Sequence, residues 1–153
     1  MAEVFEMIDL GLMTFFLGME VKQDEHEIFI CQRKYAKEIL KIFKLNECKK
    51  VSTPMNQKMK LCRDDGIDKA DEGYFRSLIG CLMYLTLSRP DILNAVSILS
   101  RFMHCATELH LRAAKRVVRY IKGTCDFGVK SLDARISNWL VFLIVTGEAL
   151  SMI

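Results

Sequence analysis

The sequence predicts an α+β fold, in which a short N-terminal β-hairpin precedes a mainly α-helical bundle. Two apolar, β-prone runs flank a polar connection near the N-terminus, and later stretches repeat apolar residues at helical spacing. Apolar residues make up 51% of the 153 residues and charged residues 27%, a balance typical of chains that bury a core. A chain of this length forms one domain or belongs to a larger protein.

The hairpin is predicted from FFLGMEV at residues 15–21, the polar stretch KQDEHE, and IFICQ at residues 28–32. Both apolar runs are short enough to be strands, and the connection between them is fully polar. Gly18 interrupts the first run, which indicates a bulge or a place where another backbone comes close.

An amphipathic helix is predicted from RKYAKEILKIFKL, which begins at Arg33. One face of this helix is apolar and the opposite face is cationic. The apolar face holds Tyr35, Ala36, Ile39, Leu40 and Phe43, and the cationic face holds Lys34, Lys37, Lys41 and Lys44. Residues 46–72 show weak periodicity and are rich in polar residues, so they are predicted to be a connector.

Two further helices follow the connector. EGYFRSLIGCLMYLTL is apolar enough to be nearly buried, and its Gly80 and Cys81 are small enough for a neighbouring helix to pack closely. Pro90 then marks the start of a helix that continues through DILNAVSILSRFMH, and Asp91 in its first turn complements the helix dipole.

The last predicted helix spans about Glu108 to Lys122, with Gly123 as its C-cap. Its apolar residues are predicted to face inward and its cations outward. The outward set is Arg112, Lys115, Arg116, Arg119 and Lys122. A row of charges opposite an apolar stripe is either a solvated surface or a contact for nucleic-acid phosphates, and the sequence leaves both interpretations open.

Other chemistry has little support in the sequence. Asp64 and Asp65 are adjacent carboxylates, but they sit in a polar connector and are interpreted as a solvated turn. His104, Cys105 and His110 are interpreted as core or surface residues rather than metal ligands. The six cysteines show no metal or disulfide spacing, which predicts reduced thiols in an intracellular protein. No signal peptide or membrane-spanning segment is found, so no membrane partner is expected.

Several blocks of the sequence resemble one family. These blocks are FEMIDLGLMTFFLGMEVKQ, QRKYAKEILKIF, STPM, YFRSLIGCLMYLTLSRPDILNAVSILSRFMH and AAKRVVRYIKGT. In this order they are similar to the reverse transcriptase in the Pol polyprotein of Ty1/copia-type retrotransposons, in the part that follows the catalytic Y-x-D-D turn. The resemblance covers residues 1 to about 130.

The resemblance implies a domain organisation. Residues 1–32 resemble the end of the palm and the primer-grip hairpin, residues 33–72 a thumb-like helix and connector, and residues 73–130 thumb and connection helices. Primer-grip residues would be Phe16, Leu17, Gly18 and Met19. The cations expected to face the phosphates of an RNA or DNA template–primer are Lys34, Lys37, Lys41, Arg112, Lys115, Arg116 and Arg119.

The resemblance also implies that the chain is catalytically inactive, because neither the Y-x-D-D turn nor a ribonuclease H carboxylate is found in it. No cofactor is expected, since magnesium belongs to the intact parent enzyme. We therefore expect a reverse-transcriptase fragment that binds nucleic acid weakly and without sequence preference. The alternatives are a partial gene model of an active RNA-directed DNA polymerase and a helical protein-interaction module. The oligomeric state is left open.

The tail at residues 131–153 differs from this pattern, because NWLVFLIVTG contains no charge. Family members reach a ribonuclease H segment of the type NFKLVGFSDSDWGGS at this point. With suitable codons, residues 138–153 can be read in a second register as LVGFSDSDWGGSIND. The tail is therefore predicted to be a frameshifted ribonuclease H start, and the gene's own bases test this prediction.

Overall fold

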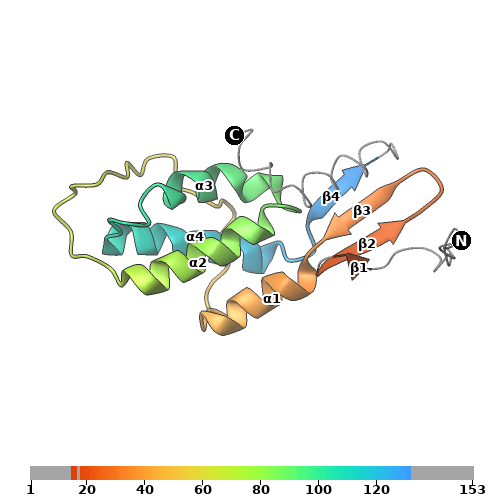
Figure 1. Ribbon diagram of the computed structural model, residues 1–153, viewed down its shortest axis with the longest axis horizontal. Helices are drawn as coiled ribbons and strands as arrows, with labels where there is room; N and C mark the ends of the chain where they lie inside the picture. The colour runs from red at the N-terminus through yellow and green to blue at the C-terminus, as the bar shows by residue number, and fades with distance from the viewer. Residues whose placement is uncertain (1–14, 17, 132–153) are drawn as a thin grey trace, which may run out of the picture.

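The computed structural model describes residues 15–16 and 18–131, and the structural statements below concern those residues. Leu17, residues 1–14 and the predicted frameshifted tail from residue 132 onward lie outside them. The described residues form four strands and four helices (Figure 1). In chain order these are β1 (Phe15–Phe16), β2 (Met19–Gln23), β3 (Ile28–Cys31), α1 (Arg33–Ile42), α2 (Glu72–Leu85), α3 (Pro90–Ser100), α4 (Glu108–Gly123) and β4 (Gly128–Ser131). The predicted α+β class is confirmed.

The sheet is antiparallel with the strand order β1-β2-β3-β4. The predicted hairpin is confirmed as the β2–β3 pair, in which Val21 lies opposite Ile30. The prediction was incomplete, because β4 returns from beyond the last helix to pair with β3. The run FFLGMEV is also split into two strands, since Gly18 turns the chain between β1 and β2 with a φ of +78°.

The helices begin near their predicted positions, and the start of α3 at Pro90 has the predicted reason. Asp71 caps α2 by accepting a hydrogen bond from the backbone N–H of Tyr74 at 3.0 Å, and Pro90 occupies the first turn of α3. Two predictions were wrong. Helix α3 ends at Ser100 instead of continuing through His104. Gly80 is exposed, and a Cβ there would meet nothing within 4 Å, so its small size serves no close helix contact.

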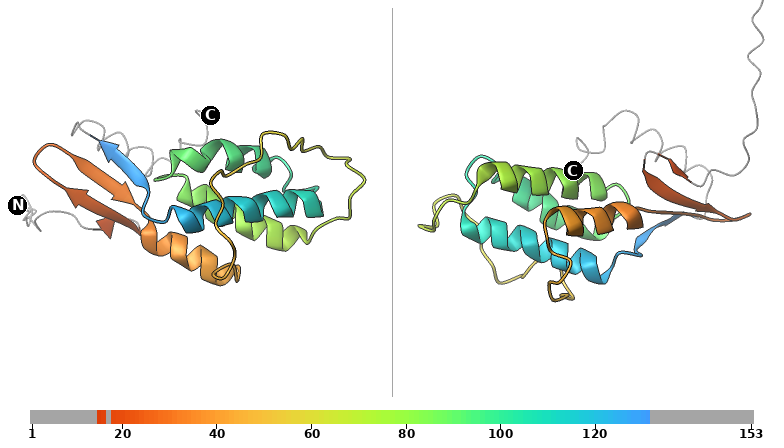
Figure 2. Two further views of the ribbon diagram at one scale, coloured as in Figure 1. Left: turned by 180° about the vertical axis from the view of Figure 1, so that it is seen from behind. Right: turned by 90° about the horizontal axis from the view of Figure 1, so that it is seen from below.

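The helices pack into one bundle with the sheet at one end (Figures 1 and 2). Helix α2 packs against α3 and α4, while α1 lies against α4 and α2. The centre is made of fully buried aliphatic and aromatic side chains, and burying each contributes about 1.5–3 kcal/mol. They include Phe75, Leu78, Ile79, Leu82, Ile92, Leu99, Val117, Val118 and Ile121. None of the described helices is long and apolar enough to cross a membrane.

Buried polar contacts join the sheet end to the bundle. Gln32, which connects β3 to α1, accepts a hydrogen bond from the hydroxyl of Ser88 at 2.7 Å. The neighbouring Arg89 is almost fully buried, and it makes two hydrogen bonds to the carboxylate of Asp91, at 2.9 and 2.8 Å. Arg89 also donates to the carbonyl and hydroxyl oxygens of Thr124, at 2.8 and 2.6 Å. These contacts fix the start of α3 to the end of α4.

Candidate nucleic-acid interface

The strongest candidate surface is the cationic side of α1. Lys34, Lys37 and Lys41 are all exposed, and the opposite side of the helix buries Ala36, Ile39 and Leu40. We call these three lysines the lysine face. Within the described part of the chain, no carboxylate forms an ion pair with any of them. The ammonium groups therefore lie on one side of a helix whose other side is fixed in the core.

The predicted primer-grip residues lie in the sheet beside this helix. Met19 is buried, and its backbone pairs with Phe16 across the turn that contains Gly18. The Lys34 ammonium lies 4.7 Å from the centre of the Phe15 ring. The structure therefore places Phe15, which directly precedes the predicted grip residues, beside Lys34 of the lysine face, while Leu17 lies outside the described residues.

The cations of α4 are placed differently from the prediction. Arg119 donates to the backbone carbonyl of Lys49 at 2.7 Å, and Arg116 donates to the hydroxyl of Thr53 at 2.9 Å. Lys122 contacts the carbonyl of Asn46 and donates to that of Cys48 at 2.8 Å. All three side chains are half-buried under the connector, which crosses α4 (Figure 2, left). They lie opposite the apolar side of α4 as predicted, but the connector covers them in part.

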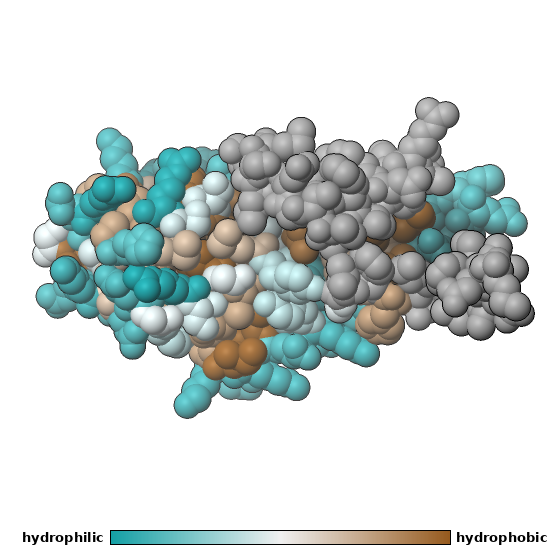
Figure 3. Space-filling model, viewed as in Figure 1, coloured by the Kyte–Doolittle hydropathy of each residue, from teal (hydrophilic) through white to brown (hydrophobic). Residues whose placement is uncertain are grey.

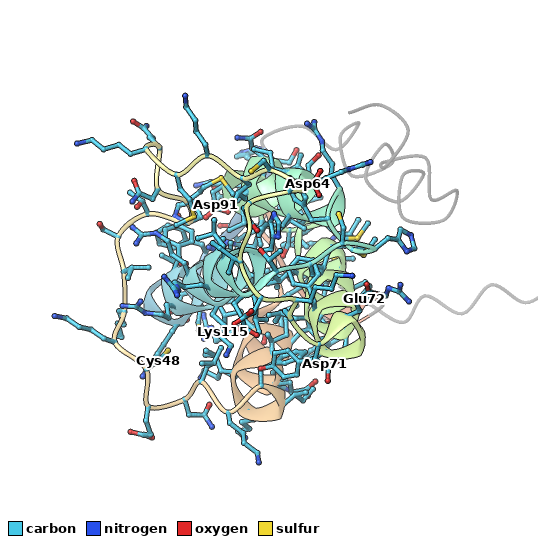
Figure 4. The ribbon with its side chains drawn as sticks, turned by 90° about the vertical axis from the view of Figure 1, so that its left-hand side faces the viewer. Cys48, Asp64, Asp71, Glu72, Asp91 and Lys115 are labelled. Atoms are coloured by element: carbon cyan, nitrogen blue, oxygen red, sulfur yellow. The ribbon has the colours of Figure 1, made fainter. Side chains whose placement is uncertain are left out.

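The two remaining α4 candidates are not under these contacts. Arg112 is exposed. Lys115 is half-buried, with its ammonium 5.8 Å from the centre of the Tyr74 ring of α2. Figure 4 shows Lys115 on the side of α4 that faces α1 and α2. The seven predicted cations therefore differ in their surroundings. The connector contacts Arg116 and Arg119, whereas Arg112 and the three lysines of α1 are exposed.

The acidic pair of the connector has a structural role in one of its members. Asp64 is exposed. Asp65 accepts hydrogen bonds from the backbone N–H of Ile67 at 3.0 Å and from the hydroxyl of Thr107 at 2.8 Å, and these bonds lower the pKa of its carboxyl. The described residues contain no group of three carboxylate, histidine or cysteine side chains that could hold a metal ion. Asp65 therefore links the connector to the start of α4 through Thr107.

The next candidates are the histidines and cysteines that the sequence analysis interpreted as core or surface residues. His110 is fully buried, stacks on Phe102 with ring centres 4.1 Å apart, and accepts the backbone N–H of Thr107 at 3.0 Å. Burial lowers the pKa of His110 below its ordinary value. The exposed His104 contacts Arg76. The six cysteines are all free.

Comparison with known proteins defines the class first. Residues 1–57 match the family model of reverse transcriptase (RNA-dependent DNA polymerase). This segment contains the described part of the grip and all of the lysine face. No solved structure matches the chain.

Relatives define the family within that class. An uncharacterized mitochondrial protein of Arabidopsis thaliana is 39% identical over 132 residues, which cover 84% of this chain and 53% of the relative. The Retrovirus-related Pol polyprotein from transposon RE1 of the same plant is 37% identical over 84% of this chain and 9% of its own length. The corresponding polyprotein from transposon TNT 1-94 of Nicotiana tabacum is 32% identical over 81% and 10%.

The resemblance found in the sequence is thereby confirmed: the chain is similar to a segment of the reverse transcriptases of Ty1/copia-type retrotransposons. The chain spans about half the length of the mitochondrial relative and about a tenth of the two polyproteins.

Proposed function

We propose that this chain binds the sugar–phosphate backbone of a template–primer of RNA or DNA through the lysine face, without reading the base sequence. The observation that carries this proposal is the exposure of Lys34, Lys37 and Lys41 on one side of α1, with no carboxylate paired to them among the described residues. Figure 3 shows hydrophilic side chains on either side of one hydrophobic patch along the edge of the molecule where α1 lies. The match to the reverse transcriptase family over the same segment supports the choice of ligand.

The α4 cations are a weaker basis for binding. Arg119 and Lys122 already donate to connector carbonyl groups, and a phosphate could reach them only if those hydrogen bonds were broken. A hydrogen bond from a charged donor contributes about 1.5–3 kcal/mol, so this exchange has a cost. The lysine face has no such competitor among the described residues, and we assign the phosphate contact to it.

Lysine side chains account for the expected lack of sequence preference. An ammonium group is a point charge on a flexible stem, which suits a phosphate but does not read the edge of a base pair. Binding through three such contacts releases condensed counterions, and the affinity therefore falls as salt rises. We expect weak binding that is sensitive to salt.

The same proposal holds that this chain does not polymerise nucleotides by itself. Nucleotidyl transfer of this kind uses carboxylates that hold two metal ions, and the sequence contains no Y-x-D-D motif to supply them. The only adjacent aspartates are Asp64 and Asp65, and both oxygens of Asp65 already accept hydrogen bonds. A primer-extension assay with purified protein, magnesium and all four nucleotides should show no product. Extension that copurifies with the chain would overturn this part of the proposal.

The binding experiment compares two triple variants with equal loss of charge. The test variant is Lys34→Gln, Lys37→Gln and Lys41→Gln. The control variant is Lys58→Gln, Lys60→Gln and Lys69→Gln, which changes exposed lysines of the connector. The part of the connector near residue 60 runs on the opposite side of the bundle from α1 (Figure 1).

Affinity for a fluorescent primer–template is measured over a series of salt concentrations. The test variant should lose affinity, and the slope of log affinity against log salt should become shallower by about 2 to 3, since each lost phosphate contact contributes roughly 0.9. The control variant should keep nearly the original slope. Equal losses in the two variants would show that net charge, rather than the lysine face, causes binding.

A further inference from the structure

Three aromatic side chains lie near Lys34, at one end of the lysine face, although they come from distant parts of the sequence. Phe15 belongs to β1, Tyr35 to α1 and Tyr84 to α2. We call this group the aromatic corner. Phe15 is 52% exposed and Tyr84 is 37% exposed, and both are among the few large hydrophobic side chains that the described residues leave on the surface. Exposed rings next to cations call for an explanation beyond core packing.

The two tyrosine rings of the aromatic corner contact each other and the β1–β2 turn. Tyr35 and Tyr84 meet edge to face, with ring centres 5.0 Å apart and planes at 83°. A Cβ on Gly18 would lie 3.5 Å from the Tyr84 hydroxyl, so the β1–β2 turn passes close to that ring. The turn, α1 and α2 therefore converge at this point. An ordered ring loses little conformational entropy when a ligand stacks on it.

The corner joins the lysine face at Lys34. The Lys34 ammonium lies 4.7 Å from the centre of the Phe15 ring, and the next residue along the chain is Tyr35. One cation therefore belongs to both groups. An exposed ring beside an ammonium matches the two chemical parts of a nucleotide, because a base has a flat π-face and its phosphate is an anion.

We propose that the aromatic corner stacks an unpaired nucleobase of a single strand, while Lys34 contacts the adjoining phosphate. Bases within a duplex are already stacked on each other, so the corner selects a base that has left the duplex or belongs to an overhang. Every base has a π-face, and the site therefore tolerates any sequence. This proposal rests on the proposed binding of nucleic acid and adds the class of strand that the site recognises.

The test uses the whole chain and two fluorescent oligonucleotides of the same length. One is a single strand of thymidine nucleotides, and the other is an abasic strand with the same number of phosphates. The original protein should bind the thymidine strand at least about fivefold more tightly, the lower end of what one stacked base contributes. The abasic strand reports phosphate contact alone.

Variants locate the stacking. Phe15→Leu and Tyr84→Leu should each lower the preference for the thymidine strand towards onefold, with binding of the abasic strand unchanged. Phe15→Tyr keeps a ring and should retain the preference. The control is Phe127→Leu, which removes another ring that is 53% exposed and lies near a cation, Arg89, at 5.4 Å. That variant should keep the preference.

The outcomes separate the two proposals. Equal binding of both strands by the original protein would overturn the stacking site while leaving phosphate binding intact. A failure to bind either strand or a primer–template would overturn the proposed function as well. The stacking site would also be refuted if the double variant Phe15→Leu and Tyr84→Leu kept the preference for the thymidine strand. The stacking site would likewise be refuted if the original protein bound both strands equally and self-associated, and if Phe15→Leu abolished the self-association. The aromatic corner would then contact a second copy of the chain.

Discussion

The buried contact between Arg89 and Asp91 leads to a testable prediction about the free energy of unfolding. The Arg89 side chain is 2% exposed and the Asp91 side chain 30%. Asp91 accepts two hydrogen bonds from Arg89 and a third from the hydroxyl of Tyr120 at 2.8 Å. Burial alone would raise the pKa of Asp91, but the hydrogen bonds from Arg89 and Tyr120 lower it below the ordinary value. Asp91 is therefore charged at neutral pH.

The substitution Asp91→Ala leaves the guanidinium of Arg89 buried with only its Thr124 partners. Removing one member of a buried ion pair costs about 3–5 kcal/mol, and the partial exposure of Asp91 favours the lower end, about 3 kcal/mol. A domain of this size has a total stability of roughly 5–15 kcal/mol, so the loss is a large fraction. Adding Arg89→Met should recover part of it, because the charge that lacked a partner is then removed.

Urea unfolding followed by circular dichroism measures this effect. The midpoint should fall in Asp91→Ala while the slope of the transition stays unchanged. The control is Glu72→Ala, which breaks an exposed pair whose Arg76 and Glu72 atoms lie 3.1 Å apart. Such a surface pair contributes about 1 kcal/mol or less. If Asp91→Ala cost no more than Glu72→Ala, the reasoning about the buried guanidinium would be wrong.

Three more predictions concern other parts of the fold. Burial lowers the pKa of His110 from its ordinary 6.5, so the unfolded chain takes up the proton first as the pH falls. The stability that is present above pH 6.5 is therefore lost as the pH falls through the lowered pKa. The urea midpoint should fall as the pH is lowered from about 7.5 to 5.5, and His110→Gln should flatten this dependence. If the midpoint depended on pH equally in both proteins, His110 would not be the cause. Replacing Arg119 and Lys122 by Met should speed tryptic cleavage of the connector roughly tenfold without an equal loss of global stability, and unchanged cleavage would show that these two residues do not restrain it. Gly18→Ala should lower the free energy of unfolding by roughly 1 kcal/mol or more, because the φ of Gly18 is +78°. The matched control is Gly66→Ala, where φ is +70° and the surrounding space is open. A larger loss of stability at residue 18 than at residue 66 would report the contact with Tyr84.

The helices could be predicted from the sequence because their signals are local. The apolar positions of α1 and α4 recur at helical spacing, and Pro90 marks the start of α3 within one residue. Strand β4 could not be predicted in the same way. Its four residues, GVKS, show little alternation, and the strand exists because it pairs with β3 far away in the chain. Periodicity carries no information about such a partner.

The candidate site could likewise be predicted only where its signals are local in the sequence. Helical spacing correctly placed Lys34, Lys37 and Lys41 on the exposed side of α1. It also placed the α4 cations opposite the apolar stripe, but it could not show that the connector lies across them. The connector has weak periodicity, and its attachment depends on backbone carbonyl groups, which every residue possesses. No residue type in the sequence marks those acceptors.

The aromatic corner shows why charge was visible in the sequence and stacking was not. Cations needed for phosphate contact can come from successive turns of one helix, so a local pattern reveals them. In this chain the rings near them come from β1, α1 and α2, and of these three rings only Tyr35 stands among the lysines in the sequence. The local sequence pattern therefore does not reveal a group of rings beside the lysines, whereas the fold places the centre of the Phe15 ring 4.7 Å from the Lys34 ammonium. If single-strand binding proves to depend on Phe15, the sheet does more than pack on the bundle. It then brings a ring from β1 to a cation on α1, and this pairing allows the site to distinguish an unpaired base from the duplex backbone beside it.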